Sequence, residues 1–278
     1  EQRSKTHRLM PGRMKREGLH MHGTFIWHEL MTPDPAAAKA FYGPLLGWEP
    51  TDMEMPGFTY TTFAVPGFPS GVAGMMELTS EMAAGGLPPN WTGYIAVDDV
   101  DQTAAQYEAE GGAIHRAPED IPGIGRFAVV ADPQGAVVCI MTPQMPDGET
   151  GSWPTPGSTG TVGWNELMAG DWEKVWDFYA ARFGWEKDMA VDMDTMGIYQ
   201  TFKLGDRGIG GMMTKRPEMP MPHWAFYFFV PAIDAAVEKV RELGGQLLMG
   251  PHQVPGGSWT AAFQDPQGAY FNLTAGTR

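Results

Sequence analysis

The sequence Trp27-His28-Glu29-Leu30-Met31 returns 137 positions later as Trp164-Asn165-Glu166-Leu167-Met168. Four further landmarks repeat in the same order: Phe41-Tyr42 as Phe178-Tyr179, Gly47-Trp48-Glu49 as Gly184-Trp185-Glu186, Gly74-Met75-Met76 as Gly211-Met212-Met213, and Asp132-Pro133-Gln134-Gly135 as Asp265-Pro266-Gln267-Gly268. The chain therefore holds two copies of one fold. Such a pair can build two similar cavities or one site across a pseudo-twofold axis.

Composition and charge exclude several classes of function. The 278 residues correspond to about two ordinary domains, and the single cysteine, Cys139, rules out an intrachain disulfide. The net charge is −14, and residues 1–20 contribute +4, so the remainder carries −18. A body this acidic repels phosphate backbones, and no apolar run approaches the roughly 20 residues that span a bilayer. We therefore expect a cytoplasmic protein without nucleic-acid or membrane partners.

The first module begins with a strand and a helix. Residues 24–31 alternate in polarity, as a strand does, and Asp34 can cap the helix that follows. Apolar residues recur at helical spacing until Gly47, which is typical of a helix end. Three short apolar stretches then complete a β-α-β-β-β pattern: residues 60–65, residues 71–78 and the entry to Trp91.

The same pattern restarts and then repeats in the second half. Residues 93–97 predict a strand, Asp101 is expected to cap the next helix, and Asp132-Pro133-Gln134-Gly135 fits a type I turn in a closing hairpin. We therefore expect an α+β fold of four such modules in two domains. The boundaries predicted are a basic tail at 1–21, with Met21 as the natural start, a first domain at 22–146, a Pro/Gly/Ser/Thr-rich linker at 147–157, and a second domain at 158–278.

Paired β-α-β-β-β modules with a Phe-Tyr on the first helix, a Gly-Trp after it and a D-P-x-G hairpin resemble the vicinal oxygen chelate superfamily. Glyoxalase I, extradiol dioxygenases and bleomycin-resistance proteins belong to it. The resemblance covers both predicted domains and is strongest to tandem glyoxalase-like members. It implies two curved sheets whose cups hold ligands or metals, and it does not fix the chemistry.

The resemblance also implies where metal ligands would stand. Its four positions per copy correspond here to Trp27, Glu77, Thr92 and Cys139, and then to Trp164, Thr214, Ala225 and Asn272. An indole has no lone pair for a metal, and a catalytic zinc or iron site normally needs three protein ligands. Glu77 and Cys139 are the only weak candidates, so no cofactor is favoured. A divalent metal bound at a displaced site is the alternative.

Glu29 and Glu166 are the candidate catalytic residues. Each lies two residues beyond the repeated tryptophan, and so on the same face of the same predicted strand. A carboxylate inside an apolar cup would have a raised pKa and could act as an acid, a base or a polar anchor. The alternative is a carboxylate that is satisfied structurally by an amide or an arginine.

The strands predicted to line the cups are rich in methionine and tryptophan. Methionine adapts to irregular apolar ligands, and ordinary core packing is the alternative interpretation. Tyr60 and Tyr199 could add hydroxyl donors at the rim. The ligand-binding residues predicted are Trp27, Met31, Tyr60, Met76, Trp164, Met168, Tyr199 and Met213.

Three functions follow from these patterns. The first is the binding of a small apolar or aromatic molecule without the family metal. The second is an enzyme of the glyoxalase or dioxygenase type with a relocated divalent metal. The third is a metal-free enzyme that uses Glu29 or Glu166 as acid or base. We expect a monomer, because the duplication supplies in one chain what single-domain relatives obtain by dimerising.

Overall fold

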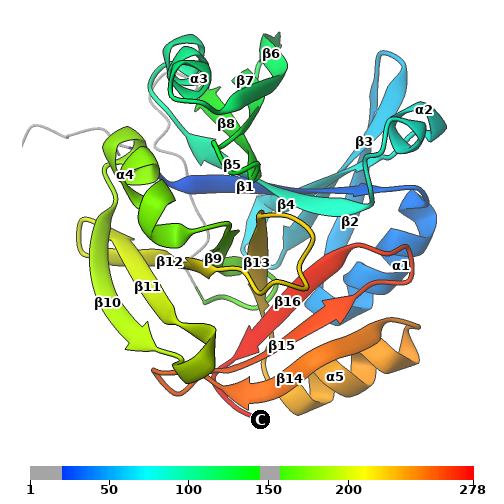
Figure 1. The fold of residues 1–278 in the computed structure, drawn as a ribbon. Helices are drawn as coiled ribbons and strands as arrows, with labels where there is room; N and C mark the ends of the chain where they lie inside the picture. The colour runs from blue at the N-terminus through cyan, green and yellow to red at the C-terminus, as the bar shows by residue number, and fades with distance from the viewer. Residues whose placement is uncertain (1–20, 145–156) are drawn as a thin grey trace, which may run out of the picture.

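The computed structural model describes residues 21–144 and 157–278. The predicted tail, apart from Met21, and nearly all of the predicted linker lie outside this part of the chain. The described residues form two mixed eight-stranded sheets, one from each half of the sequence (Figure 1). The predicted α+β fold of paired modules is confirmed. No helix among these residues is long and apolar enough to cross a membrane.

The first sheet joins two modules edge to edge. In chain order its elements are β1 (Phe25–Thr32), α1 (Pro35–Leu46), β2 (Glu49–Met55), β3 (Phe58–Val65), β4 (Phe68–Glu77), α2 (Ser80–Ala84), β5 (Asn90–Ala96), α3 (Val100–Ala109), β6 (Ala113–Ile121), β7 (Gly125–Ala131) and β8 (Val137–Pro143). The strand order is β2-β3-β4-β1-β5-β8-β7-β6. The modules meet where β1 runs antiparallel to β5.

The second sheet repeats this arrangement. Its elements are β9 (Val162–Ala169), α4 (Trp172–Phe183), β10 (Glu186–Asp192), the 3-10 turn η1 (Asp194–Met196), β11 (Ile198–Leu204), β12 (Arg207–Thr214), β13 (His223–Phe229), α5 (Ile233–Glu242), β14 (Gln246–Gln253), β15 (Trp259–Gln264) and β16 (Tyr270–Ala275). Its order, β10-β11-β12-β9-β13-β16-β15-β14, matches the first sheet strand for strand.

Local chemistry explains the helix ends. The Asp34 carboxylate accepts the N–H of Ala37, and Gly47 ends α1 at φ 70°, as predicted. The cap of α3 was predicted wrongly. Asp99, not Asp101, accepts the N–H of Gln102, because the buried apolar face of α3 already begins at Val100.

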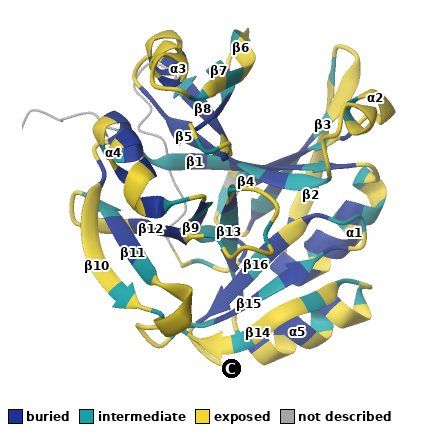
Figure 2. Ribbon diagram, viewed as in Figure 1, coloured by how far each residue is buried: buried dark blue, intermediate teal, exposed yellow. Residues whose placement is uncertain are grey.

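Two strands escaped the sequence pattern. The segment predicted as the third strand after α1, at the entry to Trp91, belongs to the next module as β5. The strand that fills this place is β2, which is exposed almost throughout and has no apolar alternation. β6 at the opposite edge is similarly exposed, with no clear alternation. Both are edge strands, coloured largely yellow or teal at the rims in Figure 2.

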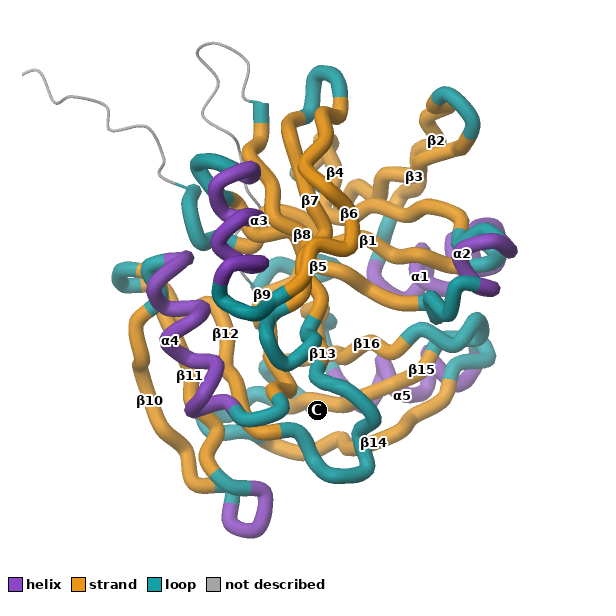
Figure 3. Tube along the Cα trace, turned by 45° about the horizontal axis from the view of Figure 1, so that its top comes forward, coloured by secondary structure: helices purple, strands orange, loops and turns teal. Residues whose placement is uncertain are grey.

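The repeated tyrosines and turns hold the two domains together. The Tyr42 hydroxyl donates to Asp265 Oδ2 at 2.8 Å, and the Tyr179 hydroxyl donates to Asp132 Oδ2 at 2.9 Å. Each helix therefore reaches the D-P-Q-G turn of the other domain. The pairing brings α1 beside α5, as Figures 1 and 3 both show.

The repeated tryptophans make a second reciprocal pair. Trp48 Nε1 donates to the carbonyl of Gly160 at 2.7 Å, and Trp185 Nε1 donates to the carbonyl of Gly23 at 2.8 Å. Both indoles are almost fully buried among aromatic rings. The landmarks that revealed the duplication are thus interdomain contacts.

The pseudo-twofold axis passes between His28 and Asn165, which are equivalent positions in contact. His28 Nε2 lies 3.0 Å from Asn165 Oδ1. The Asn165 amide nitrogen donates to the carbonyl of Ile209 at 2.9 Å, so its oxygen faces the histidine and His28 Nε2 must be the donor. Burial lowers the pKa of His28 to about 4, and the imidazole is neutral at physiological pH.

The opposite face of each central strand is free of this interface. On β1 the side chains of Trp27, Glu29 and Met31 point away from the core residue Leu30, and the outer strands rise on either side of β1 and β5 (Figure 1). We call this concave face cup one. Cup two is the equivalent face of the second sheet, around Glu166.

Candidate functional site

A cavity of about 3070 Å³ is lined by residues of both sheets. This volume is several times the roughly 300–1,000 Å³ of an ordinary ligand site. The lining includes Glu29 of cup one and Glu166 of cup two, and each cup can be treated as a site of its own.

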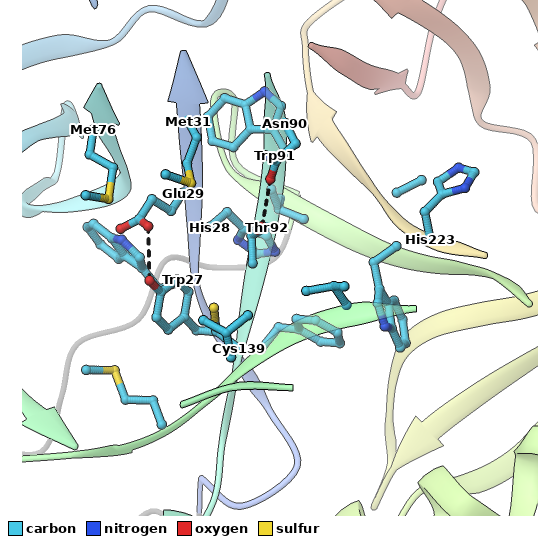
Figure 4. Close-up of a pocket in the computed structure, with 18 of the residues that line it drawn as sticks. Trp27, His28, Glu29, Met31, Met76, Asn90, Trp91, Thr92, Cys139 and His223 are labelled. Atoms are coloured by element: carbon cyan, nitrogen blue, oxygen red, sulfur yellow. Dashed lines mark hydrogen bonds between the residues drawn. The ribbon is translucent and has the colours of Figure 1, made fainter. Parts of the chain in front are cut away.

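Glu29 lies at the floor of cup one, with 9% of its surface exposed. Its Oε2 accepts the Tyr60 hydroxyl at 2.8 Å, and its Oε1 accepts the Tyr94 hydroxyl at 3.0 Å. The Tyr60 hydroxyl also accepts Trp27 Nε1–H at 2.9 Å. Figure 4 shows Glu29 between Trp27 and Met31 on β1. An indole nitrogen can only donate, so the proton of Tyr60 must point to Glu29.

This arrangement keeps Glu29 as an acceptor. Burial raises the pKa of its carboxyl, while the hydrogen bonds from Tyr60 and Tyr94 and the charge of Arg116 act in the opposite direction. Each carboxylate oxygen has more than one acceptor site, so Glu29 can still accept a hydrogen bond from a molecule in the cup. The group can therefore serve as a polar anchor or as a proton acceptor.

The glycine of the repeated Gly-Met-Met makes this geometry fit. Gly74 pairs with Glu29 across β4 and β1, and an added Cβ there would clash with the Tyr60 hydroxyl. Gly211 leaves the same room for Tyr199 in cup two. The two tyrosine hydroxyls were expected at the rim. They lie at the floor instead, because Gly74 and Gly211 have no side chain that would clash with the tyrosine rings packed over them.

Cup two repeats the floor of cup one. Trp164 Nε1 donates to the Tyr199 hydroxyl at 2.7 Å, and the Tyr227 hydroxyl donates to Glu166 Oε1 at 2.9 Å. Glu166 is 6% exposed. Burial raises its pKa, and the hydrogen bonds from Tyr227 and Tyr199 oppose that rise. Both copies thus keep a buried carboxylate with two tyrosine donors.

Sequence reasoning missed Tyr94 and Tyr227. Each lies directly opposite the repeated tryptophan of its own sheet, Tyr94 beside Trp27 and Tyr227 beside Trp164. A signal was present, because the two tyrosines are 133 residues apart, which is the offset of the later landmarks. Neither stands in a repeated run of identical residues, so the comparison of the copies did not single them out.

The cups differ in how much of the predicted ligand surface they present. Glu29, Trp27, Met31, Tyr60 and Met76 all line the cavity in cup one. In cup two, Glu166 and Met168 line it. Among the described residues that form the cavity wall, three predicted contacts do not appear: Trp164, Tyr199 and Met213.

Among the described residues, those weighed as metal ligands do not form a group of three with Glu29. Glu77 is exposed at the end of β4, three residues beyond Gly74, the partner of Glu29. Cys139 is buried beside Tyr94, and burial raises the pKa of its thiol, which is therefore protonated. Both carboxylate oxygens of Glu29 already accept a hydrogen bond from a tyrosine hydroxyl.

These donors do not fit the three-ligand site of a catalytic zinc or iron. Within residues 21–144 and 157–278, no group of three or more His, Cys, Asp or Glu side chains is placed to hold a metal ion.

Two relatives resemble the chain over nearly its whole length. CFP32 of Mycobacterium tuberculosis, a candidate glyoxylase by its name, is 33% identical over 274 residues, which cover 94% of this chain and 97% of CFP32. The anthracycline biosynthesis protein DnrV of Streptomyces peucetius is 32% identical over 262 residues, which cover 90% of this chain and 92% of DnrV.

A solved structure and a family model agree with the fold. The Mn(II)-bound glyoxalase from Novosphingobium aromaticivorans matches 92% of this chain and 83% of its own with a TM-score of 0.62, and its 15% identity limits the likeness to the fold. The model of one superfamily matches residues 24–140 and again residues 161–273, one match per domain. The chain belongs to the Glyoxalase/Bleomycin resistance protein/Dioxygenase superfamily.

Proposed function

We propose that the cups bind a small aromatic molecule, anchored at the floor by the buried carboxylate and without the metal of the family. The observation that carries the proposal is the Glu29 cluster, in which two tyrosines hold a carboxylate at the bottom of an apolar cup. Glu166 supplies the same anchor in cup two.

The mouth of cup one supports an apolar or aromatic ligand. Scattered exposed apolar side chains are ordinary on a protein surface, whereas a group of them around one opening indicates a binding site. The exposed apolar residues that line this cavity on the side of the first sheet are Met53, Phe58, Leu87, Ile124 and Val137. Such side chains favour a flat apolar body over a sugar or a phosphate.

The floor supports a ligand that carries a hydrogen-bond donor. Glu29 accepts hydrogen bonds from Tyr60 and Tyr94, and when ionised it has no proton to donate. The complementary group on the ligand is therefore a hydroxyl or an amine. The name of DnrV, an anthracycline biosynthesis protein, agrees with this description, since anthracyclines are polycyclic aromatic phenols. We take the ligand class of this chain to be fused-ring aromatic phenols.

The test compares 2-naphthol with naphthalene as probes in wild-type protein and in Glu29→Gln and Glu166→Gln variants. A hydrogen bond to a charged group contributes about 1.5–3 kcal/mol, so each variant is expected to weaken 2-naphthol binding in its own cup by roughly ten- to a hundredfold. Naphthalene binding is expected to stay unchanged. Isothermal titration calorimetry gives the affinity and the number of sites.

The matched control is Glu77→Gln, which removes an exposed carboxylate that does not bond to the floor tyrosines. Failure of the wild type to bind either probe would refute the proposal, as would Gln variants that bind 2-naphthol at full strength. Elemental analysis tests the metal-free part. A stoichiometric divalent metal whose removal abolishes 2-naphthol binding would overturn it.

A second candidate is an enzyme of the same superfamily that uses Glu29 as a general base. The raised pKa of this buried carboxyl favours the candidate, since a base with a pKa nearer neutrality takes protons more effectively. The probe is 2-tetralone, a fused-ring ketone with an acidic C–H beside its carbonyl. In D2O, Glu29 would remove that proton, and the enolate would take a deuteron from solvent.

Proton NMR measures the exchange. A rate that rises with pH as Glu29 ionises, and that Glu29→Gln removes, supports the enzyme. Equal exchange in both proteins contradicts it.

We also propose that the chain acts as a monomer. The reciprocal Tyr–Asp and Trp–carbonyl contacts are satisfied between the two domains of one chain, which leaves no such contact for a second copy. A sedimentation profile at twice the chain mass would refute this.

A further inference from the structure

Strand register aligns the two cups residue by residue. In each sheet one transverse row crosses five neighbouring strands, and the side chains of such a row lie on one face. The rows are Trp27, Tyr94, Cys139, Val129 and Arg116 in cup one, and Trp164, Tyr227, Asn272, Ala262 and Met249 in cup two. The row is identical at its tryptophan and tyrosine and different at its far end.

Arg116 brings a positive charge to the wall of cup one. Its guanidinium lies 4.9 Å from the centre of the Phe127 ring, and its charge lowers the pKa of Glu29 at the floor. It forms an ion pair with Glu119, but the two side chains are 51% and 45% exposed. An ion pair this open to water contributes little, so Arg116 can exchange Glu119 for an anionic group in the cup.

Met249 gives cup two a neutral wall at the same place. Thr260 stands where Phe127 stands in cup one. Arg216 lies beside Met249, with Nη2 3.9 Å from its sulfur, and it also lines the cavity. The pKa of Glu166 is shifted by burial, Tyr227 and Tyr199, and not by the charge of a described arginine. Cup two therefore offers the same floor with a methionine at the place of Arg116, and the guanidinium of Arg216 does not act on Glu166 as that of Arg116 acts on Glu29.

We propose that Arg116 makes cup one selective for aromatic ligands that carry both a hydrogen-bond donor and an anionic group, whereas cup two takes neutral aromatic phenols. The donor meets Glu29, and the anion meets the guanidinium across the cup. This inference rests on the proposed binding function and adds a division of labour between the two copies. Arg116 is the residue that determines the specificity.

Two probes of one shape test it: 2-naphthol and 6-hydroxy-2-naphthoic acid, which adds a carboxylate at the far end of the same rings. Calorimetry on the wild type is expected to show two sites for 2-naphthol and one for the acid. Arg116→Met installs the side chain that cup two already holds. It should weaken the binding of the acid at least about tenfold and change 2-naphthol binding less than about twofold.

Met249→Arg is the converse variant and is expected to create a second site for the acid. The matched control is Arg126→Met, which removes an arginine from the same β6–β7 hairpin that pairs with Asp101 and Asp120 on the outside. This control should leave both affinities unchanged, which separates a local contact from the loss of one positive charge.

Each outcome decides something. If Arg116→Met binds the acid as tightly as the wild type, or loses both probes equally, the selectivity assigned to Arg116 is refuted while 2-naphthol binding by the wild type still stands. If the wild type binds 2-naphthol and binds the acid at two equal sites, the division of labour is refuted. If it binds neither probe, the proposed function fails and this inference fails with it.

Discussion

The interface between the domains and the walls of the cups were duplicated together, yet they have diverged to different degrees. At the interface both copies keep Tyr and Asp and make the same bonds, Tyr42 to Asp265 and Tyr179 to Asp132. In the cups the floor is kept, but the position of Arg116 in cup one is occupied by Met249 in cup two. An interface residue must fit the other copy of the fold, so a change in one copy has to suit both domains. A wall residue meets only a ligand, and each wall is free to change alone.

The largest expected effect is a loss of stability when a tryptophan of the interface is removed. Trp185 is 3% exposed and stacks on Phe202 with ring centres 4.5 Å apart. Trp185→Ala should lower the free energy of unfolding by about 3–5 kcal/mol, and Trp48→Ala should do the same. Trp27→Ala, in a cup, should cost less than half as much. Urea unfolding measures all three, and similar losses for Trp27 and Trp185 would contradict the contrast.

A slightly smaller effect concerns pH and the pair on the axis. Burial lowers the pKa of His28 from 6.5 to about 4 in the folded chain. Between pH 4 and pH 6.5, His28 is mostly protonated in the unfolded chain and mostly neutral in the folded chain. The stability associated with the neutral histidine is complete above pH 6.5 and declines by about 3 kcal/mol as the pH falls toward 4.

The variant His28→Asn lacks this titration. The difference in the free energy of unfolding between wild type and variant should therefore shift in favour of the variant from pH 7.5 to pH 4.5. Carboxylates common to both proteins, including the buried Glu29 and Glu166, cancel in that difference. Parallel pH profiles for the two proteins would show that His28 is not the titrating group.

The smallest expected effect on stability sharpens the view of the cups as separate sites. Gly74→Ala places a methyl group against the Tyr60 hydroxyl, and overpacking of this kind costs about 1–3 kcal/mol. Since Tyr60 must move, 2-naphthol should be lost from cup one only, and the number of sites should fall from two to one. Gly276→Ala, where an added Cβ meets nothing, is the control. Loss of both sites would mean that the cups are coupled.

The sequence predicted the scaffold well, because scaffold residues satisfy local rules. Asp34 and Gly47 mark the ends of α1 by their own backbone chemistry, and the D-P-Q-G turns close their hairpins. β2 and β6 were missed because an exposed edge strand has no apolar alternation to detect. Elements that bury one face could be predicted, and elements at the rim could not.

The site could be predicted only in part, because its contacts join distant strands. Glu29 was found from the repeat, but its donors Tyr60 and Tyr94 lie on β3 and β5 and meet it only through register and through Gly74. The place of Arg116 depends on the pairing of five strands in succession. No local pattern encodes such a row, so only the three-dimensional structure could reveal it.

The contact between His28 and Asn165 has a consequence for how such a protein can evolve. In a dimer of identical chains, the residue on the axis faces its own copy, and two asparagines oriented like Asn165 would oppose oxygen to oxygen. Once both halves are encoded in one gene, a donor can stand on one side and an acceptor on the other. Gene fusion thus made available a heterogeneous pair at the one place where a symmetric dimer is obliged to repeat itself.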